Sequence, residues 1–461
     1  MALQFRSSKN KEESVHTLRP RYAKVATKIL MARFIEDLTS AQSIGYCPHL
    51  RIAKRMKKLL ITFAVIQMLV ACDDVRSRDE VTKTQGGMTS GEMMKDERVS
   101  EGGMVVMAGS EVGGESGPQQ VSYVGLIHEV TTELVGEQGA VGAVVIIVTE
   151  EHTEVLGLGL RDLGGEAVDA QTLFQIGSVS KTVTGLLLAS KIEKSGSTLS
   201  ANDPVNLHLT NLVVPDGQGG PITMEHLATH YSALPNFPDN LIGPPTSPGQ
   251  GYTRELLNIF LSAHTLDYEP GTRYLYSNLG YGLLGLSLAD AEGASGYEQL
   301  LNDHFIEPLS LERTGLNRPE FLERIGDNVS QGFGGDEGRT AVGFAEMGAL
   351  AGSGEILSTG SDMAVFLRVM CGLSPFPVPG AIDRALTPRA QGEGMVKIAY
   401  GWDVKDSDPP MWTKSGLTPG FTSYVALQQN PPVGVAILSN RGRHRAIMDA
   451  VNALITRVTL E

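Results

Sequence analysis

Three short stretches carry residues whose types and spacing could perform nucleophilic chemistry. In the first, FQIGSVSKTVTG (174–185), Ser178 and Lys181 lie three positions apart at the start of an apolar-periodic segment that runs to Ile192. Residues three apart share one face of a helix, so the lysine amine is expected beside the serine hydroxyl. A serine hydroxyl is a weak nucleophile until a neighbour accepts its proton. A neutral lysine can accept it if desolvation and nearby positive charge lower the pKa of the amine.

An ordinary helix start explains the same pattern, with Ser178 as N-cap and Lys181 solvated in the first turn. Ser-x-x-Lys alone is weak evidence, because Ser8 and Lys11 repeat the spacing near the N-terminus. A helix N-terminus nevertheless offers free backbone N–H groups and the positive end of the helix dipole, both of which favour an oxyanion. The pair therefore needs support from other parts of the chain.

The second stretch, YLYSNLGYG (274–282), holds Tyr276 and Asn278 between a Pro-Gly turn and an apolar helix. Their spacing places a phenol and an amide on the same side of a short extended segment. A phenol can relay a proton if nearby ammonium groups lower its pKa. The alternative is a capping loop in which Ser277 or Asn278 is the N-cap of the helix. Capping and catalysis do not exclude each other.

The third stretch, WTKSGLTPG (412–420), places Lys414, Ser415 and Gly416 on a strand-like segment that ends in a Pro-Gly turn. A lysine and a hydroxyl there could hold a substrate carboxylate, and Gly416 permits a ligand to approach the strand backbone closely. A second Lys-Ser-Gly at 194–196 has no strand context. It is typical of a helix that ends with a lysine and a glycine stop.

The elements that must position these stretches alternate in type along residues 121–461. Strand patterns lie at both ends, and a helical block from about 178 to 300, broken by Pro/Gly loops, lies between them. We predict an α+β fold, with one antiparallel sheet formed by N- and C-terminal strands, flanked by helices, and a mainly helical subdomain. The other predicted elements are a helix near 121–136, strands near 143–150, 152–160, 396–404, 410–416, 421–429 and 433–440, and a last helix near 443–457.

In this order, Ser-x-x-Lys, Tyr-x-Asn and Lys-Ser-Gly resemble the class C β-lactamases and the related penicillin-binding DD-peptidases. The stretches DPVNLHL, ITMEHLATHYSALP, PGTRYLYSNLGYGLLG and GSGEILSTGSDMAVFL share the resemblance, which covers essentially all of residues 121–461. It implies the β-lactamase/transpeptidase fold. It also implies that Ser178 is the acylated nucleophile and that Lys181 is its proton acceptor or the group that tunes it. Tyr276 is then the proton shuttle to the leaving nitrogen and later the activator of water.

The resemblance implies four binding roles as well. Asn278 contacts Lys181 and the substrate amide, and Lys414 and Ser415 bind the substrate carboxylate. The backbone N–H groups of Ser178 and Leu417 form the oxyanion hole. Two departures from the family pattern are present. Lys-Ser-Gly replaces the more typical Lys-Thr-Gly and keeps the hydroxyl, and the stretch HYSALP (230–235) replaces the usual His-Thr-Ser-Gly-Leu.

We therefore expect a serine hydrolase that acts through an acyl-enzyme on β-lactams, D-alanyl-D-alanine peptides or both. An esterase on the same scaffold remains an alternative. A catalytically silent penicillin- or peptidoglycan-binding protein is another, and the intact motif residues count against it. No cofactor is implied. His226 and His230 lie four apart, a spacing that suits metal ligation. Because no third ligand lies near them in the sequence, helix packing or capping is the favoured interpretation, and no metal is predicted.

Charge and cysteine content limit the partners of the chain. Residues 1–71 hold 13 basic and 4 acidic residues, whereas the rest holds 25 basic and 48 acidic ones. An acidic body argues against nucleic-acid binding, which needs a basic surface. The cysteines Cys47, Cys72 and Cys371 are too few and too scattered for a disulfide framework. The oligomeric state is left open.

Residues 56–71 match a lipoprotein signal peptide. Two lysines follow Met56, and the apolar run of residues 59–71 ends in Leu-Val-Ala before Cys72. This run is too short to span a membrane and suits a secretory signal. Its end resembles the bacterial lipobox, in which the cysteine is lipidated. We predict a lipid anchor at Cys72 in the bacterial cell envelope, with the catalytic domain facing the periplasm or the exterior. The alternative is a core helix that ends in cysteine.

The predicted domain organisation follows from these boundaries. Residues 1–55 are interpreted as a mis-called or untranslated leader before a true start at Met56, the alternative being a long n-region. Residues 72–120 are rich in Gly, Ser and Glu without periodicity, which is typical of a disordered tether. Residues 121–461 are the predicted serine β-lactamase-like catalytic domain.

Overall fold

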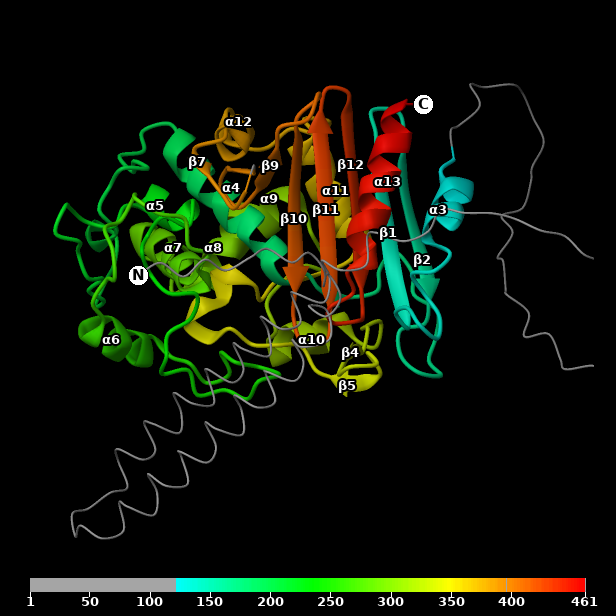
Figure 1. Cartoon of the computed structure of the whole chain (residues 1–461), viewed down its shortest axis with the longest axis horizontal. Helices are drawn as coiled ribbons and strands as arrows, with labels where there is room; N and C mark the ends of the chain where they lie inside the picture. The colour runs from blue at the N-terminus through cyan, green and yellow to red at the C-terminus, as the bar shows by residue number, and fades with distance from the viewer. Residues whose placement is uncertain (1–121, 395, 461) are drawn as a thin grey trace, which may run out of the picture. The chain divides into compact units, whose positions relative to one another are not determined.

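The structure is a computed structural model, and it describes residues 122–394 and 396–460 (Figure 1). The predicted leader, signal peptide and tether, with the anchor residue Cys72, lie outside the described residues and stay predictions. Within the described ranges, no helix is long and apolar enough to cross a membrane.

An eight-stranded antiparallel sheet joins the two ends of the described chain, in the order β2-β1-β12-β11-β10-β9-β8-β7 (Figure 1). Val145 of β1 pairs with Ile437 of β12, which places N- and C-terminal strands side by side. The predicted sheet is thereby confirmed. The strands are β1 (Gly142–Val148), β2 (Thr153–Gly159), β7 (Ala390–Gln391), β8 (Lys397–Ile398), β9 (Asp403–Lys405), β10 (Met411–Leu417), β11 (Thr422–Gln429) and β12 (Pro432–Ser439).

Both faces of the sheet are covered, which explains why β1 is an unbroken apolar run in the sequence. Alternate side chains of β1 enter two different cores, since successive residues of a strand point to opposite faces. Val145 packs with α3 (Val124–Thr131) and α13 (Ala446–Leu460). Ile146 packs into the larger core, which includes α4 (Ser180–Glu193) and α11 (Gly360–Met370). Figure 1 shows α13 lying along β11 and β12.

A mainly helical region extends from this sheet, and α7 (Asn278–Ala291) is its central element. Its side chains are buried on all sides as far as Ala289, as expected for a helix that is apolar all round. It packs against α4, so the two helices that begin at the predicted site support each other. The other helices are α5 (Met224–Ala228), α6 (Arg254–Ala263), α8 (Tyr297–Leu301), η3 (Asn302–Ile306), α9 (Glu307–Leu309), α10 (Pro319–Ile325) and α12 (Ala381–Leu386).

Smaller elements connect the two regions. Two short pairings, β3 (Phe174–Gln175) with β6 (Leu357–Ser358) and β4 (Gly332–Gly334) with β5 (Thr340–Val342), lie outside the main sheet. Three turns of 3-10 helix complete the described elements: η1 (Gly177–Val179), η2 (Val205–Leu207) and η4 (Gly348–Ser353).

The structure differs from the sequence prediction at the strand expected near 396–404 and at the start of the last helix. The segment 396–404 is a β8–β9 hairpin instead of one strand, because the chain turns at Gly401, whose φ is +80°. The last helix begins at Ala446, since the preceding Arg443 has a φ of +57°, outside the helical region.

Candidate active site

Ser178 lies in η1, the single 3-10 turn that leads into α4. The strand β3 ends at Gln175, and Gly177 turns the chain with a φ of +51°, a conformation that glycine adopts without strain. No side chain caps η1 or α4, so the N-cap interpretation of Ser178 is wrong. Its hydroxyl is half-buried and faces Lys181 and Tyr276.

Lys181 is completely buried, and its amine has three polar neighbours. Nζ lies 3.2 Å from Ser178 Oγ and 2.6 Å from Asn278 Oδ1, and it also donates to the carbonyl of Ser353. A neutral amine has two N–H groups and one lone pair. Two carbonyl-type oxygens take the two N–H groups, and the lone pair is then left for the hydroxyl of Ser178.

Burial lowers the pKa of Lys181 well below its usual value, and the positive charge of Lys414 lowers it further. This is the combination of desolvation and like charge that the sequence interpretation required. A lysine in this state can accept a proton from a serine hydroxyl, which makes Ser178 and Lys181 a competent nucleophile and base.

Tyr276 reaches the same serine from the start of α7. Its hydroxyl donates to Ser178 Oγ at 2.8 Å. Ser277 caps α7 by accepting from Gly280 N at 2.8 Å, so the capping alternative is correct for Ser277 and leaves Asn278 free to contact Lys181. The expectation that ammonium groups lower the pKa of Tyr276 is wrong here, because burial raises that pKa and outweighs its hydrogen bond to Ser178. The phenol is a proton donor in this state.

Asn278 is oriented by a residue that the sequence did not indicate. Its Nδ2 donates to Asn236 Oδ1 at 2.8 Å, which turns its own Oδ1 toward Lys181. Asn236 Oδ1 also accepts from the backbone N–H of Asn278 at 3.3 Å. The two asparagines are 42 positions apart, and no local pattern links them.

Lys414 and Ser415 lie on β10, one on each face of the strand. The Lys414 amine is 5.3 Å from the Tyr276 ring centroid and 3.6 Å from Asp403 Oδ2. Asp403 is a second residue that sequence reasoning missed. It is brought to the site by the β9–β10 pairing, in which Thr413 opposes Asp403. A cavity of about 410 Å³ is lined by Ser178, Tyr276, Asp403, Lys414 and Ser415 among others.

The backbone nitrogen of Leu417 lies beside the turn that carries Ser178. Thr418 N donates to Phe421 O at 2.9 Å, toward β11. Because N–H groups alternate in direction along an antiparallel strand, the N–H of Leu417 points away from β11. Its nitrogen lies 2.7 Å from where a Cβ on Gly177 would sit. The two backbone segments that carry Ser178 and Leu417 therefore adjoin, which is compatible with the predicted oxyanion hole.

Gly416 has a different reason to be glycine from the one predicted. A Cβ at this position would lie 2.0 Å from the carbonyl oxygen of Ile176, which also accepts from Ser423 Oγ at 2.7 Å. The space is filled by the segment that carries Ser178, and not by a ligand. Gly416 thus allows β10 to pack directly against the nucleophile turn.

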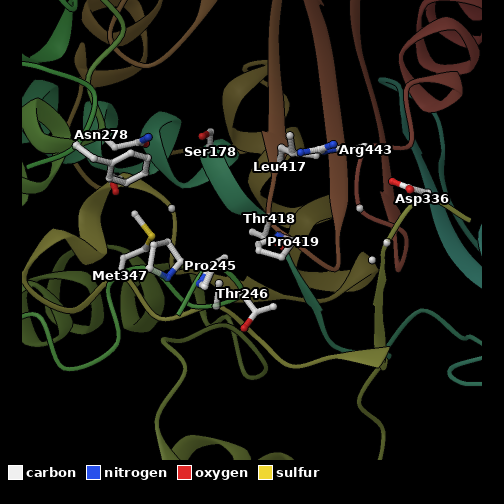
Figure 2. Close-up of a pocket in the computed structure, with 18 residues that line it drawn as sticks. Ser178, Pro245, Thr246, Asn278, Asp336, Met347, Leu417, Thr418, Pro419 and Arg443 are labelled. Atoms are coloured by element: carbon white, nitrogen blue, oxygen red, sulfur yellow. The ribbon is translucent and has the colours of Figure 1, made fainter. Parts of the chain in front are cut away.

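An open cavity of about 490 Å³ begins at Ser178 and Asn278. Figure 2 shows Pro245, Thr246 and Met347 on one wall, with Leu417, Thr418 and Pro419 across from them. In the same view the charged side chains Asp336 and Arg443 lie toward the opposite end from Asn278. The volume is that of a site for a small molecule or a short peptide.

The two histidines weighed as metal ligands have other partners. His226 forms a capping box with Thr223. Its Nδ1 accepts from the backbone N–H of Thr223, and its backbone N–H donates to Thr223 Oγ1. His230 lies against Tyr276, with 4.4 Å between the ring centroids. Among the described residues, no group of three His, Cys, Asp or Glu side chains could hold a metal ion.

Comparison with known sequences gives one family. The family model described as Beta-lactamase matches residues 127–457. The chain is 28% identical over 364 residues to a protein named Beta-lactamase from Escherichia coli strain K12, which covers 70% of this chain and 90% of that one. It is 26% identical over 343 residues to the D-alanyl-D-alanine-carboxypeptidase/endopeptidase AmpH of the same strain, covering 70% and 86%.

Solved structures agree on the fold. The octameric penicillin-binding protein homologue from Pyrococcus abyssi has a TM-score of 0.61 and 24% identity, over 72% of this chain and 77% of that one. The β-lactamase/D-alanine carboxypeptidase from Yersinia pestis, complexed with citrate, also has a TM-score of 0.61 and 24% identity, over 73% and 99%. At this identity the two likenesses show the fold alone.

Proposed function

This chain belongs to the beta-lactamase family, and from that premise we propose that it is a serine hydrolase that forms an acyl-enzyme with β-lactams and D-alanyl-D-alanine peptides. One observation carries the proposal. Ser178 Oγ lies 3.2 Å from the buried amine of Lys181 and 2.8 Å from the hydroxyl of Tyr276. A serine with a neutral base on one side and a proton donor on the other is arranged for acyl transfer.

Acylation transfers one proton from the serine to the leaving group. As Ser178 Oγ attacks the carbonyl carbon, its proton moves to the lone pair of Lys181, and the oxyanion is held by the N–H groups of Ser178 and Leu417. The carbon–nitrogen bond then breaks, and the nitrogen takes the proton of Tyr276. Lys181 returns its extra proton to the Tyr276 oxygen, so both groups end neutral.

Deacylation uses the same groups in reverse. Water attacks the ester carbon and gives one proton to Lys181, directly or through the Tyr276 oxygen. The intermediate collapses, the carbon–Oγ bond breaks, and Ser178 Oγ recovers a proton. Because burial raises the pKa of Tyr276, the phenol keeps its own proton, and the neutral amine of Lys181 is the group with a free lone pair to take the proton from water.

The test is labelling with a fluorescent penicillin, read by intact mass. The wild-type protein is expected to gain one penicillin adduct, at Ser178. Ser178→Ala should gain none, whereas Ser195→Ala, a control on the exposed Lys-Ser-Gly copy at 194–196, should label as the wild type does. A wild type that never forms an adduct would contradict the proposal. Ester turnover without penicillin labelling would favour an esterase, and neither activity would favour a silent binding protein.

The lifetime of the adduct separates the two substrate classes. A short-lived adduct with turnover of a chromogenic cephalosporin indicates a β-lactamase, and a long-lived adduct with release of D-alanine from a D-alanyl-D-alanine peptide indicates a carboxypeptidase. Relatives of both names match this chain over similar lengths. We also propose that Cys72 anchors the enzyme in the cell envelope, on the basis of the signal pattern at residues 56–72.

A further inference from the structure

His230 is a buried residue next to the reactive serine that the mechanism above does not use. It is 2% exposed and has a φ of +64°, a conformation that costs energy for a residue other than glycine. Its Nε2 is buried and has no hydrogen-bond partner within the described part of the chain. A buried polar atom without a partner also costs stability. Two such costs at one residue call for a functional explanation.

Its contacts converge on the backbone around Tyr276. The carbonyl oxygen of His230 accepts from Leu275 N at 2.8 Å, and its Nδ1 accepts from Ser277 N at 3.1 Å. One residue therefore holds the residue before Tyr276 and the residue after it. Since Nδ1 is an acceptor, the proton of the neutral imidazole lies on Nε2.

The imidazole also supports the Tyr276 ring. The centroids of His230 and Tyr276 are 4.4 Å apart with an interplanar angle of 36°. The imidazole also contacts the Tyr281 ring, with 5.0 Å between the ring centroids. The Tyr281 hydroxyl is fixed in turn, because it donates to Ala228 O at 2.6 Å. The phenol of Tyr276 thus rests on a ring that is itself held in place.

We propose that His230 is a positioning residue for Tyr276, which it fixes by two backbone hydrogen bonds and one ring contact so that the phenol hydroxyl stays within reach of Ser178. This inference rests on the proposed function, because it assigns a part of the same acyl transfer. Burial, together with the positive charge of Lys414, lowers the pKa of His230 well below its usual value. The imidazole is therefore neutral, as its acceptor role at Nδ1 requires.

Two substitutions separate the ring from the acceptor. His230→Phe keeps a ring and loses the acceptor for Ser277 N, and we expect it to slow penicillin acylation by about 10²-fold through misplacement of Tyr276. His230→Asn keeps an acceptor near the Nδ1 position and tolerates a positive φ, so its loss should be smaller. His226→Asn, in the capping box and away from Tyr276, should change thermal stability and leave the acylation rate as in the wild type.

A double-mutant cycle with Tyr276→Phe shows whether His230 acts through the phenol. If it does, His230→Phe slows acylation in the wild type and causes no further loss in the Tyr276→Phe background. Equal losses in both backgrounds would indicate a purely structural role and overturn the proposal. Should His230→Phe not fold, as judged by its melting curve, His230→Asn takes its place in the same cycle.

A second readout does not depend on activity. In the ¹⁵N spectrum of the wild-type imidazole, His230 should carry its proton on Nε2 and none on Nδ1. A proton on Nδ1 would remove the acceptor for Ser277 N and contradict the proposal. If the wild type forms no penicillin adduct, the proposed function fails, and the spectrum still decides whether His230 has the arrangement inferred for it.

Discussion

Lys181 and Lys414 are the two lysines of the candidate site, and their environments differ. Within the described part of the chain, the Lys181 amine has no carboxylate partner and hydrogen-bonds only to neutral oxygens. Lys414 lies 3.6 Å from Asp403 Oδ2. Burial lowers the pKa of Lys181, and the positive charge of Lys414 further disfavours an extra proton on that amine. The difference between a neutral base and a charged binding residue thus follows from the burial of Lys181 and from its distance to a cation instead of a carboxylate.

This arrangement predicts the direction of a pH change. Only neutral Lys181 can accept the Ser178 proton, so the acylation rate constant should fall by about tenfold per pH unit below the pKa of Lys181. Lys414→Gln removes a charge that lowers this pKa, so the acidic limb should move to higher pH. The measurement is the pH profile of penicillin acylation, with the exposed Lys194→Gln as control. If the acidic limb of the Lys414→Gln profile lies at the same pH as that of the wild type, the charge of Lys414 does not affect Lys181.

The contact between η1 and β10 brings together the two backbone segments of the proposed oxyanion hole. Gly177 and Gly416 let the two backbones approach to a distance that no Cβ would permit. The hole therefore depends on the packing of two backbone segments more than 230 positions apart in the chain. Any residue that separates them should affect the rate more than the fold.

Gly177→Ala tests this contact. The new Cβ would lie 2.7 Å from Leu417 N, and the φ of +51° adds strain of about 1–2 kcal/mol. We expect acylation to slow by roughly 10²–10³-fold, the loss typical of one oxyanion donor. Gly196→Ala is the matched control, because its φ is +78° and nothing lies within 4 Å of a Cβ there. Gly196→Ala should lose some stability and keep the wild-type acylation rate. Similar acylation rates in both variants would contradict the argument.

A buried ion pair supports the segment that carries the carbonyl partner of Lys181. Glu355 is fully buried, pairs with Arg318 and accepts from Met347 N at 2.7 Å. It follows Ser353 by two residues, and the next N–H, that of Ile356, donates to Ser180 Oγ at 3.2 Å. Glu355 thereby joins the two ends of the segment 347–356, and Ile356 fixes one of those ends to α4.

Removing one member of this pair should be costly. Glu355→Ala removes one partner of Arg318 and leaves the buried N–H of Met347 without its acceptor, so we expect the free energy of unfolding to fall by about 1–3 kcal/mol. Arg318 also pairs with Glu298 at 3.2 Å, but that carboxylate is 46% exposed, so Glu298→Ala should cost less than about 1 kcal/mol. Urea unfolding of the two variants gives the comparison, and equal losses would show that burial does not set the strength of the pair.

At the scale of the whole molecule, the sequence predicts the sheet because its strands are apolar runs at both ends of residues 121–461, as β1 and β12 show. It also contained an unused signal for α11, where Thr359 caps the helix by accepting from Asp362 N. The contact between Lys414 and Asp403 could not be predicted from the sequence, because it depends on the register of the β9–β10 hairpin. The same is true of His230 and Tyr276, which only the folded chain brings together.

The predicted envelope location rests on Cys72, which lies outside the described residues. If Cys72 is lipidated, a chain synthesised in its bacterial host should be recovered in the membrane fraction, since several acyl chains on one cysteine give stable anchoring. Cys72→Ala should move the protein to the soluble fraction with its penicillin labelling unchanged, because the site lies beyond residue 177. Cys371→Ala is the matched control, since that thiol is buried in the folded domain, and it should leave the protein membrane-bound. Continued membrane association of Cys72→Ala would refute the lipid anchor while leaving the acyl-enzyme chemistry of Ser178 intact.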